Sequence, residues 1–163
     1  MHASDFIAVL PESILTITGM LVILVAAFQE KTDARWSSVL TCAGLLGAGT
    51  AVVYQWGSTG QAFGGVYLAD PFNHFFHLLF LLIALIVVLA SAGYLERERL
   101  AAAEFYALLL FATVGMGIMA SANELVLLFI GLEISSLSSY ILVGFRRDAD
   151  LGSEAAQIGR AHV

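Results

Sequence analysis

Glu133 is the residue most able to do chemistry, because it lies near the middle of the apolar segment 124–145. At about 1.5 Å per helical residue, this segment is long enough to cross a hydrocarbon core of about 30 Å. A charged carboxylate at that depth costs about 2.5–3.5 kcal/mol, so membrane helices seldom carry one without a use. The carboxyl group either stays neutral and hydrogen-bonds a neighbouring helix, or takes up and releases protons. We favour proton transfer, because intramembrane acids usually mark proton or ion paths.

Hydroxyl groups share the helical face of Glu133. Ser136 follows it by about one turn and Tyr140 by about two, and both side chains can hydrogen-bond a carboxyl group. We therefore expect Ser136 and Tyr140 to support Glu133.

Two histidines and a second acid lie near the starts of other apolar segments. His74 and His77 are three residues apart and share a helical face, but a metal site would need more ligands than the sequence places nearby. We expect packing or interfacial histidines, with His77, the deeper one, as a candidate proton relay. Glu12 stands in the first turn of its segment, where it suits the positive end of a helix.

The composition is that of a membrane protein. Of the 163 residues, 60% are hydrophobic and 12% are charged, whereas soluble domains contain about 45–50% apolar and about 25% charged residues. The formal net charge of −6 argues against nucleic acid as a partner, since that needs a basic face. The lipid bilayer is the expected surroundings of the chain.

The fold class predicted is all-α, a polytopic helical membrane protein. Gly-Gly between short apolar runs predicts a small β-hairpin near 61–69, and Asp70-Pro71 predicts an N-cap followed by proline at the first helical position. Ser153–Ala156 reads as the first turn of a sixth helix. The five predicted membrane-spanning helices run roughly over 11–28, 36–56, 71–95, 104–121 and 124–145.

Basic residues predict how the helices are oriented. They follow the first, third and fifth predicted spans, whereas the amino terminus and the other two connections contain none. By the positive-inside rule, the amino terminus lies outside and the connections with basic residues are cytoplasmic. The residues concerned are Lys31, Arg35, Arg97, Arg99, Arg146 and Arg147.

The segment from Met116 to Tyr140, followed by Ser153–Ala156, closely resembles subunit N (subunit 2) of the proton-pumping NADH–quinone oxidoreductase, respiratory complex I. The resemblance covers the chain from the first span to about Ala156, and it makes the chain similar to an amino-terminal fragment of an antiporter-like subunit. It divides the chain into three leading helices with the hairpin connector, residues 1–103, and the start of the proton-translocation core, residues 104–157.

The resemblance implies a membrane-arm subunit without a redox centre. The chain itself would hold no cofactor or metal, while NADH, FMN, Fe–S clusters and quinone would bind other subunits of the complex. Its partners would be other membrane subunits, in a bacterial inner membrane rather than a mitochondrial or plastid one. We expect the fragment alone to be inactive as an enzyme, although it would be part of a translocase.

The resemblance also assigns residues. Glu133 matches the glutamate of the family's Gly-Leu-Glu segment, which belongs to a chain of intramembrane acids and lysines that moves protons. His77 stands where the family commonly has lysine. Residues Ile158–Val163 depart from the family's pattern, and we expect them to be a translated sequencing adapter rather than native sequence.

Two other functions stay open on the sequence alone. The Gly-Leu-Glu segment also occurs in subunits of multisubunit cation/proton antiporters, so the chain could belong to one of those. A structural membrane scaffold, in which a neutral Glu133 only ties helices together, is the other alternative.

Overall fold

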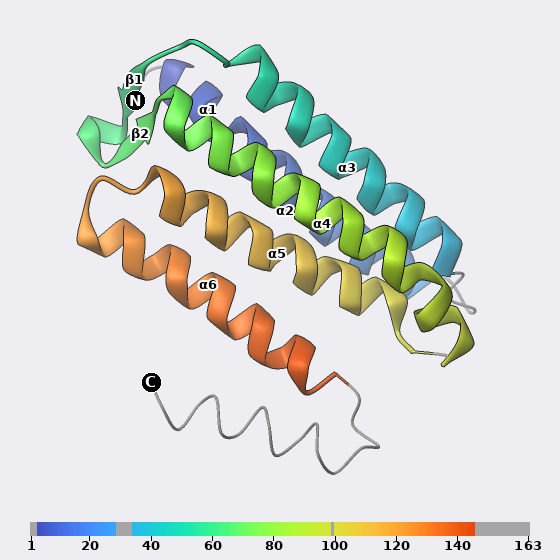
Figure 1. The fold of residues 1–163 in the computed structure, drawn as a ribbon. Helices are drawn as coiled ribbons and strands as arrows, with labels where there is room; N and C mark the ends of the chain where they lie inside the picture. The colour runs from blue at the N-terminus through green and yellow to red at the C-terminus, as the bar shows by residue number, and fades with distance from the viewer. Residues whose placement is uncertain (1–2, 29–33, 99, 146–163) are drawn as a thin grey trace.

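The computed structural model describes residues 3–28, 34–98 and 100–145 and is a bundle of long helices (Figure 1). The predicted all-α membrane fold is confirmed, because five helices are long and apolar enough to cross a membrane. The predicted sixth helix at Ser153–Ala156 and the tail at Ile158–Val163 lie outside the described residues. The five long helices are α2 (Leu10–Phe28), α3 (Ala34–Tyr54), α4 (Pro71–Arg97), α5 (Ala102–Ser121) and α6 (Leu125–Val143).

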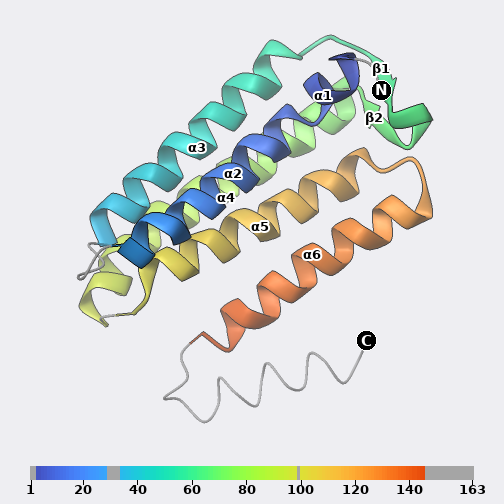
Figure 2. The same ribbon diagram turned by 180° about the vertical axis from the view of Figure 1, so that it is seen from behind.

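Consecutive long helices run antiparallel, and α5 is central among them (Figures 1 and 2). Helix α5 packs against α2, α3, α4 and α6, while α6 packs chiefly on α5. In the apolar windows of these two helices, 56% of the α5 residues are buried but only 11% of the α6 residues. The described residues therefore leave the outer face of α6 largely uncovered.

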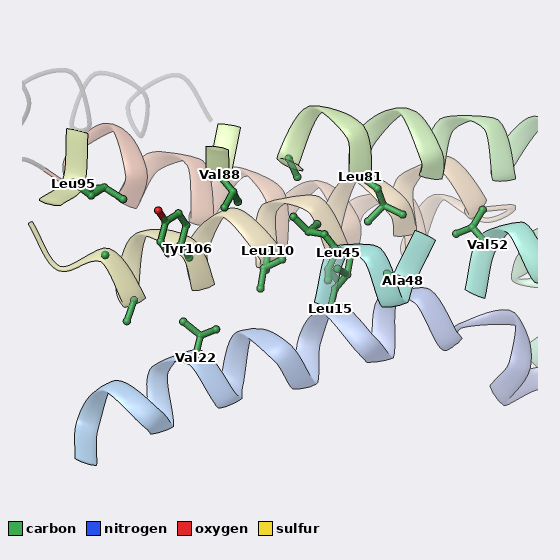
Figure 3. Packing of buried hydrophobic residues seen from close by; sticks show 14 residues of the cluster. Leu15, Val22, Leu45, Ala48, Val52, Leu81, Val88, Leu95, Tyr106 and Leu110 are labelled. Atoms are coloured by element: carbon green, nitrogen blue, oxygen red, sulfur yellow. The ribbon is translucent and has the colours of Figure 1, made fainter. Parts of the chain in front are cut away.

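The helices meet through small and aliphatic residues rather than through bulky polar contacts. Buried side chains such as Leu15, Val52 and Leu110 fill the space between α2, α3 and α5 (Figure 3). Gly115 and Gly131 let the backbones of α5 and α6 touch, since a Cβ added to Gly115 would lie 2.6 Å from the Gly131 carbonyl oxygen. Close approach through small residues is how membrane helices associate where lipid is as apolar as the helices themselves.

A β-hairpin covers one end of the bundle, in the segment where Gly-Gly predicts it. Strand β1 (Gly60–Ala62) pairs antiparallel with β2 (Tyr67–Ala69), and the 3-10 turn η1 (Phe63–Gly65) joins them. Gly64 and Gly65 have φ of 74° and 98°, a left-handed region that other residues rarely enter. The Asp70 carboxylate then accepts a hydrogen bond of 2.8 Å from the Asn73 N–H, so Asp70 is the N-cap of α4.

The amino-terminal end contains an element that the sequence did not predict. A short helix, α1 (Ala3–Ala8), precedes α2 and contacts β1. Together α1, the hairpin, the starts of α2, α4 and α6 and the ends of α3 and α5 make up the hairpin end of the bundle (Figure 1). Arg35 and Arg97 lie at the opposite end, where the Arg35 guanidinium is 3.9 Å from the Glu96 carboxylate.

Candidate functional site

Glu133 lies on α6, where this helix crosses α5 most closely. It is half-buried, and its neighbours Gly131 and Ser135 are the residues that touch Gly115 of α5. The crossing therefore fixes the rotation of α6 and with it the position of the Glu133 side chain.

The predicted support for Glu133 does not form as hydrogen bonds in this structure. Ser136 and Tyr140 are both half-buried, but among the described residues neither hydroxyl is hydrogen-bonded to the Glu133 carboxylate. Ser138, on the same helix, donates instead to the Ile134 carbonyl oxygen at 2.8 Å. Such bonds to the preceding turn are a common local solution for serine in a helix. The role of Ser136 and Tyr140 stays a prediction.

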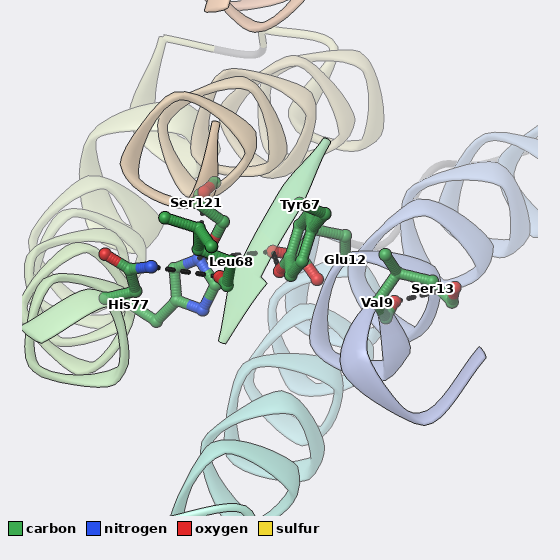
Figure 4. A network of polar contacts seen from close by, with 9 residues as sticks. Val9, Glu12, Ser13, Tyr67, Leu68, His77 and Ser121 are labelled. Atoms are coloured by element: carbon green, nitrogen blue, oxygen red, sulfur yellow. Dashed lines mark hydrogen bonds and ion pairs between the residues drawn. The ribbon is translucent and has the colours of Figure 1, made fainter. Parts of the chain in front are cut away.

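A second polar centre lies at the hairpin end of the bundle and brings together groups from four elements, α2, β2, α4 and α5 (Figure 4). The Tyr67 hydroxyl of β2 donates to the Glu12 Oε1 atom of α2 at 2.9 Å. The His77 Nε2 atom of α4 lies 3.2 Å from the same oxygen. From α5, the Gly117 carbonyl oxygen lies 2.9 Å from His77 Nε2, and the Ser121 hydroxyl lies 3.3 Å from it.

Local sequence explains why these groups can meet. Pro11 and Glu12 lie in the first turn of α2, while the Asp70 cap starts α4 about two turns before His77. Gly117 makes room for both side chains, because a Cβ there would lie 3.2 Å from Glu12 Oε1 and 3.2 Å from His77 Nε2. A larger residue at this position would press against the pair.

The pair lies between two helix ends, because Glu12 is in the first turn of α2 and Ser121 is the last residue of α5. The Gly117 carbonyl only accepts hydrogen bonds, so His77 Nε2 must carry the proton that lies between them. Glu12 Oε1 accepts its hydrogen bond from the Tyr67 hydroxyl and lies in charge-contact range of the His77 ring.

Tyr67 remains a neutral donor in this setting. Its side chain is buried, and burial raises the pKa of the phenol above its ordinary value. The negative charge of Glu12 raises that pKa further, because a second charge beside the carboxylate is unfavourable.

The predicted candidates do not form one site. His77 lies on α4 and Glu133 on α6, and α5 runs between these two helices (Figures 1 and 2). His74 is buried, with its ring 6.5 Å from that of Trp56, and its Nε2 atom has no hydrogen-bond partner among the described residues. Within those residues, no group of three or more His, Cys, Asp or Glu side chains could hold a metal ion.

Glu12 is the residue that sequence reasoning underestimated. Its position in a first helical turn accounts for a carboxylate there, so nothing required a further role. A usable signal was present, because the predicted antiparallel spans put the starts of helices 11–28 and 71–95 at the same end. An acid and a histidine, each near the start of its span, are then at similar depth.

Comparison with known proteins shows which proteins the chain is similar to. No protein-family model matches it. It is 41% identical over 147 residues to NADH-quinone oxidoreductase subunit N of Trichlorobacter lovleyi, which is 90% of this chain and 30% of that protein. It is 39% identical over 149 residues to NAD(P)H-quinone oxidoreductase subunit 2 of a Nostoc species, covering 91% of this chain and 29% of that one.

A solved structure agrees with these sequence relatives. A chain of respiratory complex I from Thermus thermophilus, determined with bound aureothin, superposes with a TM-score of 0.75 at 30% sequence identity. The match covers 93% of this chain and 32% of that one, and the chain spans about 30% of the length of the curated relatives. The predicted family is thus confirmed: over most of its length the chain belongs to the NADH-quinone oxidoreductase subunit N family of respiratory complex I.

Proposed function

We propose that the chain is part of a membrane-arm subunit that translocates protons while other subunits of its complex reduce quinone with NADH. The relatives named as subunit N and the complex I chain of the same fold support this proposal. NADH, FMN, Fe–S clusters and quinone would then bind other subunits, and the partners of this chain would be the neighbouring membrane subunits and the lipid.

We assign the proton-carrying role within the membrane to Glu133, and one observation supports this most strongly. The side chain is half-buried on a membrane-spanning helix. Gly131 and Ser135 face α5, and Glu133, two residues from each, lies about 200° round the helix from them, on the side that the described residues leave largely uncovered. A further helix packed on that side would bring its own side chains to the carboxyl group.

The mechanism follows from the cost of burying charge. An apolar environment disfavours the ionised form of a carboxyl group, so a carboxyl group enclosed by such surroundings keeps its proton. A lysine brought close favours the ionised form, so its approach releases the proton. The uncovered face of α6 leaves room for further helices to bring such a group near Glu133.

The orientation belongs to the same proposal. The described arginines, Arg35 and Arg97, lie at the end of the bundle opposite the hairpin. The positive-inside rule then makes the hairpin end the outer one. In a bacterial inner membrane, the Glu12–His77 centre would lie near the outer surface and Glu133 deeper in the bilayer.

Glu133→Gln in the complete subunit tests the role of the carboxyl group. We expect NADH-driven acidification of inverted membrane vesicles to fall strongly, with normal amounts of assembled complex, because glutamine keeps the shape but cannot release a proton. Glu124→Gln is the matched control, since Glu124 is exposed at the start of the same helix. Wild-type acidification in Glu133→Gln would leave only a structural role for Glu133.

The antiporter alternative predicts a different activity. A purified assembly containing this chain should reduce quinone with NADH if it is a complex I. Sodium–proton exchange without NADH-dependent quinone reduction would instead assign the chain to a cation/proton antiporter.

A further inference from the structure

The Glu12–His77 centre is a buried acid–base pair that the proposed role of Glu133 does not use. Only 9% of the Glu12 side chain and 6% of the His77 side chain are exposed, and the two are 3.2 Å apart. Burying both an acid and an imidazole is costly unless each is well paired. The partners of each polar atom in the pair therefore decide how costly its burial is.

The two carboxyl oxygens of Glu12 have different surroundings. Oε1 accepts a hydrogen bond from the Tyr67 hydroxyl at 2.9 Å and lies 3.2 Å from His77 Nε2. Oε2 is buried and has no hydrogen-bond partner among the described residues. An ionised oxygen without a donor is costly in such a place, whereas a protonated oxygen that donates to a water molecule costs less.

A small cavity adjoins the pair on its inner side. Its volume is about 10 Å³, close to the minimum that one water molecule needs. Its walls continue about one turn from the pair toward the middle of the bundle, and the hydroxyl-bearing residue there is Thr113. The cavity is lined by Pro11, Glu12, Leu15, His77, Phe80, Leu81, Thr113 and Gly117.

The hairpin closes the opposite side of the pair. Tyr67 lies over Glu12 and is 3% exposed, and it bridges to Ala122 at the end of α5. Asn123 holds the hairpin in place, because its backbone N–H donates to the Val66 carbonyl at 2.9 Å and its side-chain amide to the Gly65 carbonyl at 2.7 Å. The pair is therefore covered by the hairpin on one side and borders the cavity on the other.

Glu12 and His77 are the titratable residues that line the inner cavity, and the other titratable groups nearby do not line it. Tyr67 faces it from β2, and His74 precedes it by one turn on α4, with Asp70 at the cap of that helix. From α5 the facing groups are the Gly117 carbonyl and the Ser121 hydroxyl, which do not titrate at ordinary pH. The described arginines are at the other end of the bundle.

We propose that Glu12 and His77 form a second proton-binding site, in which Glu12 Oε2 holds an exchangeable proton beside the inner cavity and the hairpin closes the outer side. On release, the O–H bond at Oε2 breaks, its electron pair stays on the carboxyl group, and the proton passes to a water molecule in the cavity. The carboxylate left behind keeps the Tyr67 hydroxyl as a donor to Oε1, with the His77 ring 3.2 Å away. This site does not depend on the role of Glu133.

Infrared difference spectroscopy can test the site in the complete subunit, assembled in its complex in lipid nanodiscs. Spectra recorded between about pH 4 and about pH 9 bracket the titration of most carboxyl groups and histidines. Labelling glutamate with ¹³C at the side-chain carboxyl separates its C=O band from that of aspartate. We expect a protonated-carboxyl band that changes with pH, is absent in Glu12→Gln, and persists in the exposed control Glu124→Gln.

A second variant keeps the test decisive if Glu12→Gln does not assemble. Tyr67→Phe retains the carboxyl group but removes one donor to it, so the same band should remain and move in frequency. A pH-difference spectrum that is unchanged in Glu12→Gln, or a band whose frequency Tyr67→Phe leaves unaltered, would overturn the proposal.

Discussion

The α5–α6 crossing offers the sharpest structural prediction, because a single methyl group should disturb it. A Cβ added to Gly115 would lie 2.6 Å from both the Gly131 carbonyl oxygen and the Ser135 backbone nitrogen. Ordinary contact begins near 3.4 Å, so Gly115→Ala forces the two helices about 0.8 Å apart at this point. Both atoms belong to backbone and cannot turn away as a side-chain tip could.

The expected magnitude follows from two opposing effects. Replacing a helical glycine by alanine favours the helix by about 1 kcal/mol, whereas overpacking a tight contact costs about 1–3 kcal/mol and separating the helices adds lost dispersion contacts. We expect Gly115→Ala to destabilise the helix pair by about 1–2 kcal/mol overall. Glu133 should also shift with α6, because it lies between Gly131 and Ser135.

Gly93→Ala is the matched control for this prediction. Gly93 is also helical, but a Cβ there would meet nothing within 4 Å, so only the gain in helix propensity remains. Unfolding of the complete subunit by sodium dodecyl sulfate in mixed micelles would compare the two variants. If Gly115→Ala is as stable as Gly93→Ala, the close crossing of α5 and α6 is wrong.

Three further predictions concern the hairpin end. Tyr67→Phe should lower the free energy of unfolding by about 1–3 kcal/mol in the same micelle assay, because a buried acceptor loses a donor. The fold raises the pKa of Tyr67, so the stability linked to its phenol is present below the ordinary tyrosine value of about 10 and is lost as the pH rises above that value. Tyr67→Phe should lessen this loss of stability at alkaline pH. An unchanged dependence of stability on pH would contradict the burial of the phenol. Asp70→Ala should cost about 0.5–2 kcal/mol through the lost N-cap, and a neutral result would refute the cap. Thr59→Cys, in a Cys42→Ala background, should react with a membrane-impermeant maleimide in whole cells, and labelling only after permeabilisation would reverse the orientation.

The sequence could predict the elements whose signals are local. Apolar segments of membrane-crossing length gave all five long helices, because each must satisfy its own backbone in lipid. Gly-Gly between apolar runs indicated the hairpin, and Asp70-Pro71 indicated the start of α4, since both depend on backbone geometry near the residues themselves. The bounds differ by one or two residues at most ends, where helices fray or tighten.

The polar centre could not be predicted in the same way, because it depends on how segments pack. Glu12, Tyr67 and His77 meet only after α2, α4 and the hairpin are docked against α5. A helical spacing can place Ser136 and Tyr140 on the face of Glu133, but it cannot say which acceptor a hydroxyl will choose. In this chain several hydroxyls, including those of Thr18 and Thr113, bond the carbonyl of the preceding turn.

The number of protons moved for each NADH oxidised tests the role of Glu133 most directly. It should be measured with the purified complex in proteoliposomes, comparing wild type with Glu133→Gln and Glu133→Asp. We predict fewer protons per NADH in Glu133→Gln, and partial recovery in Glu133→Asp, which restores a carboxyl group one methylene shorter. An unchanged ratio in Glu133→Gln, with quinone reduction intact, would contradict the assignment of proton transfer to this side chain.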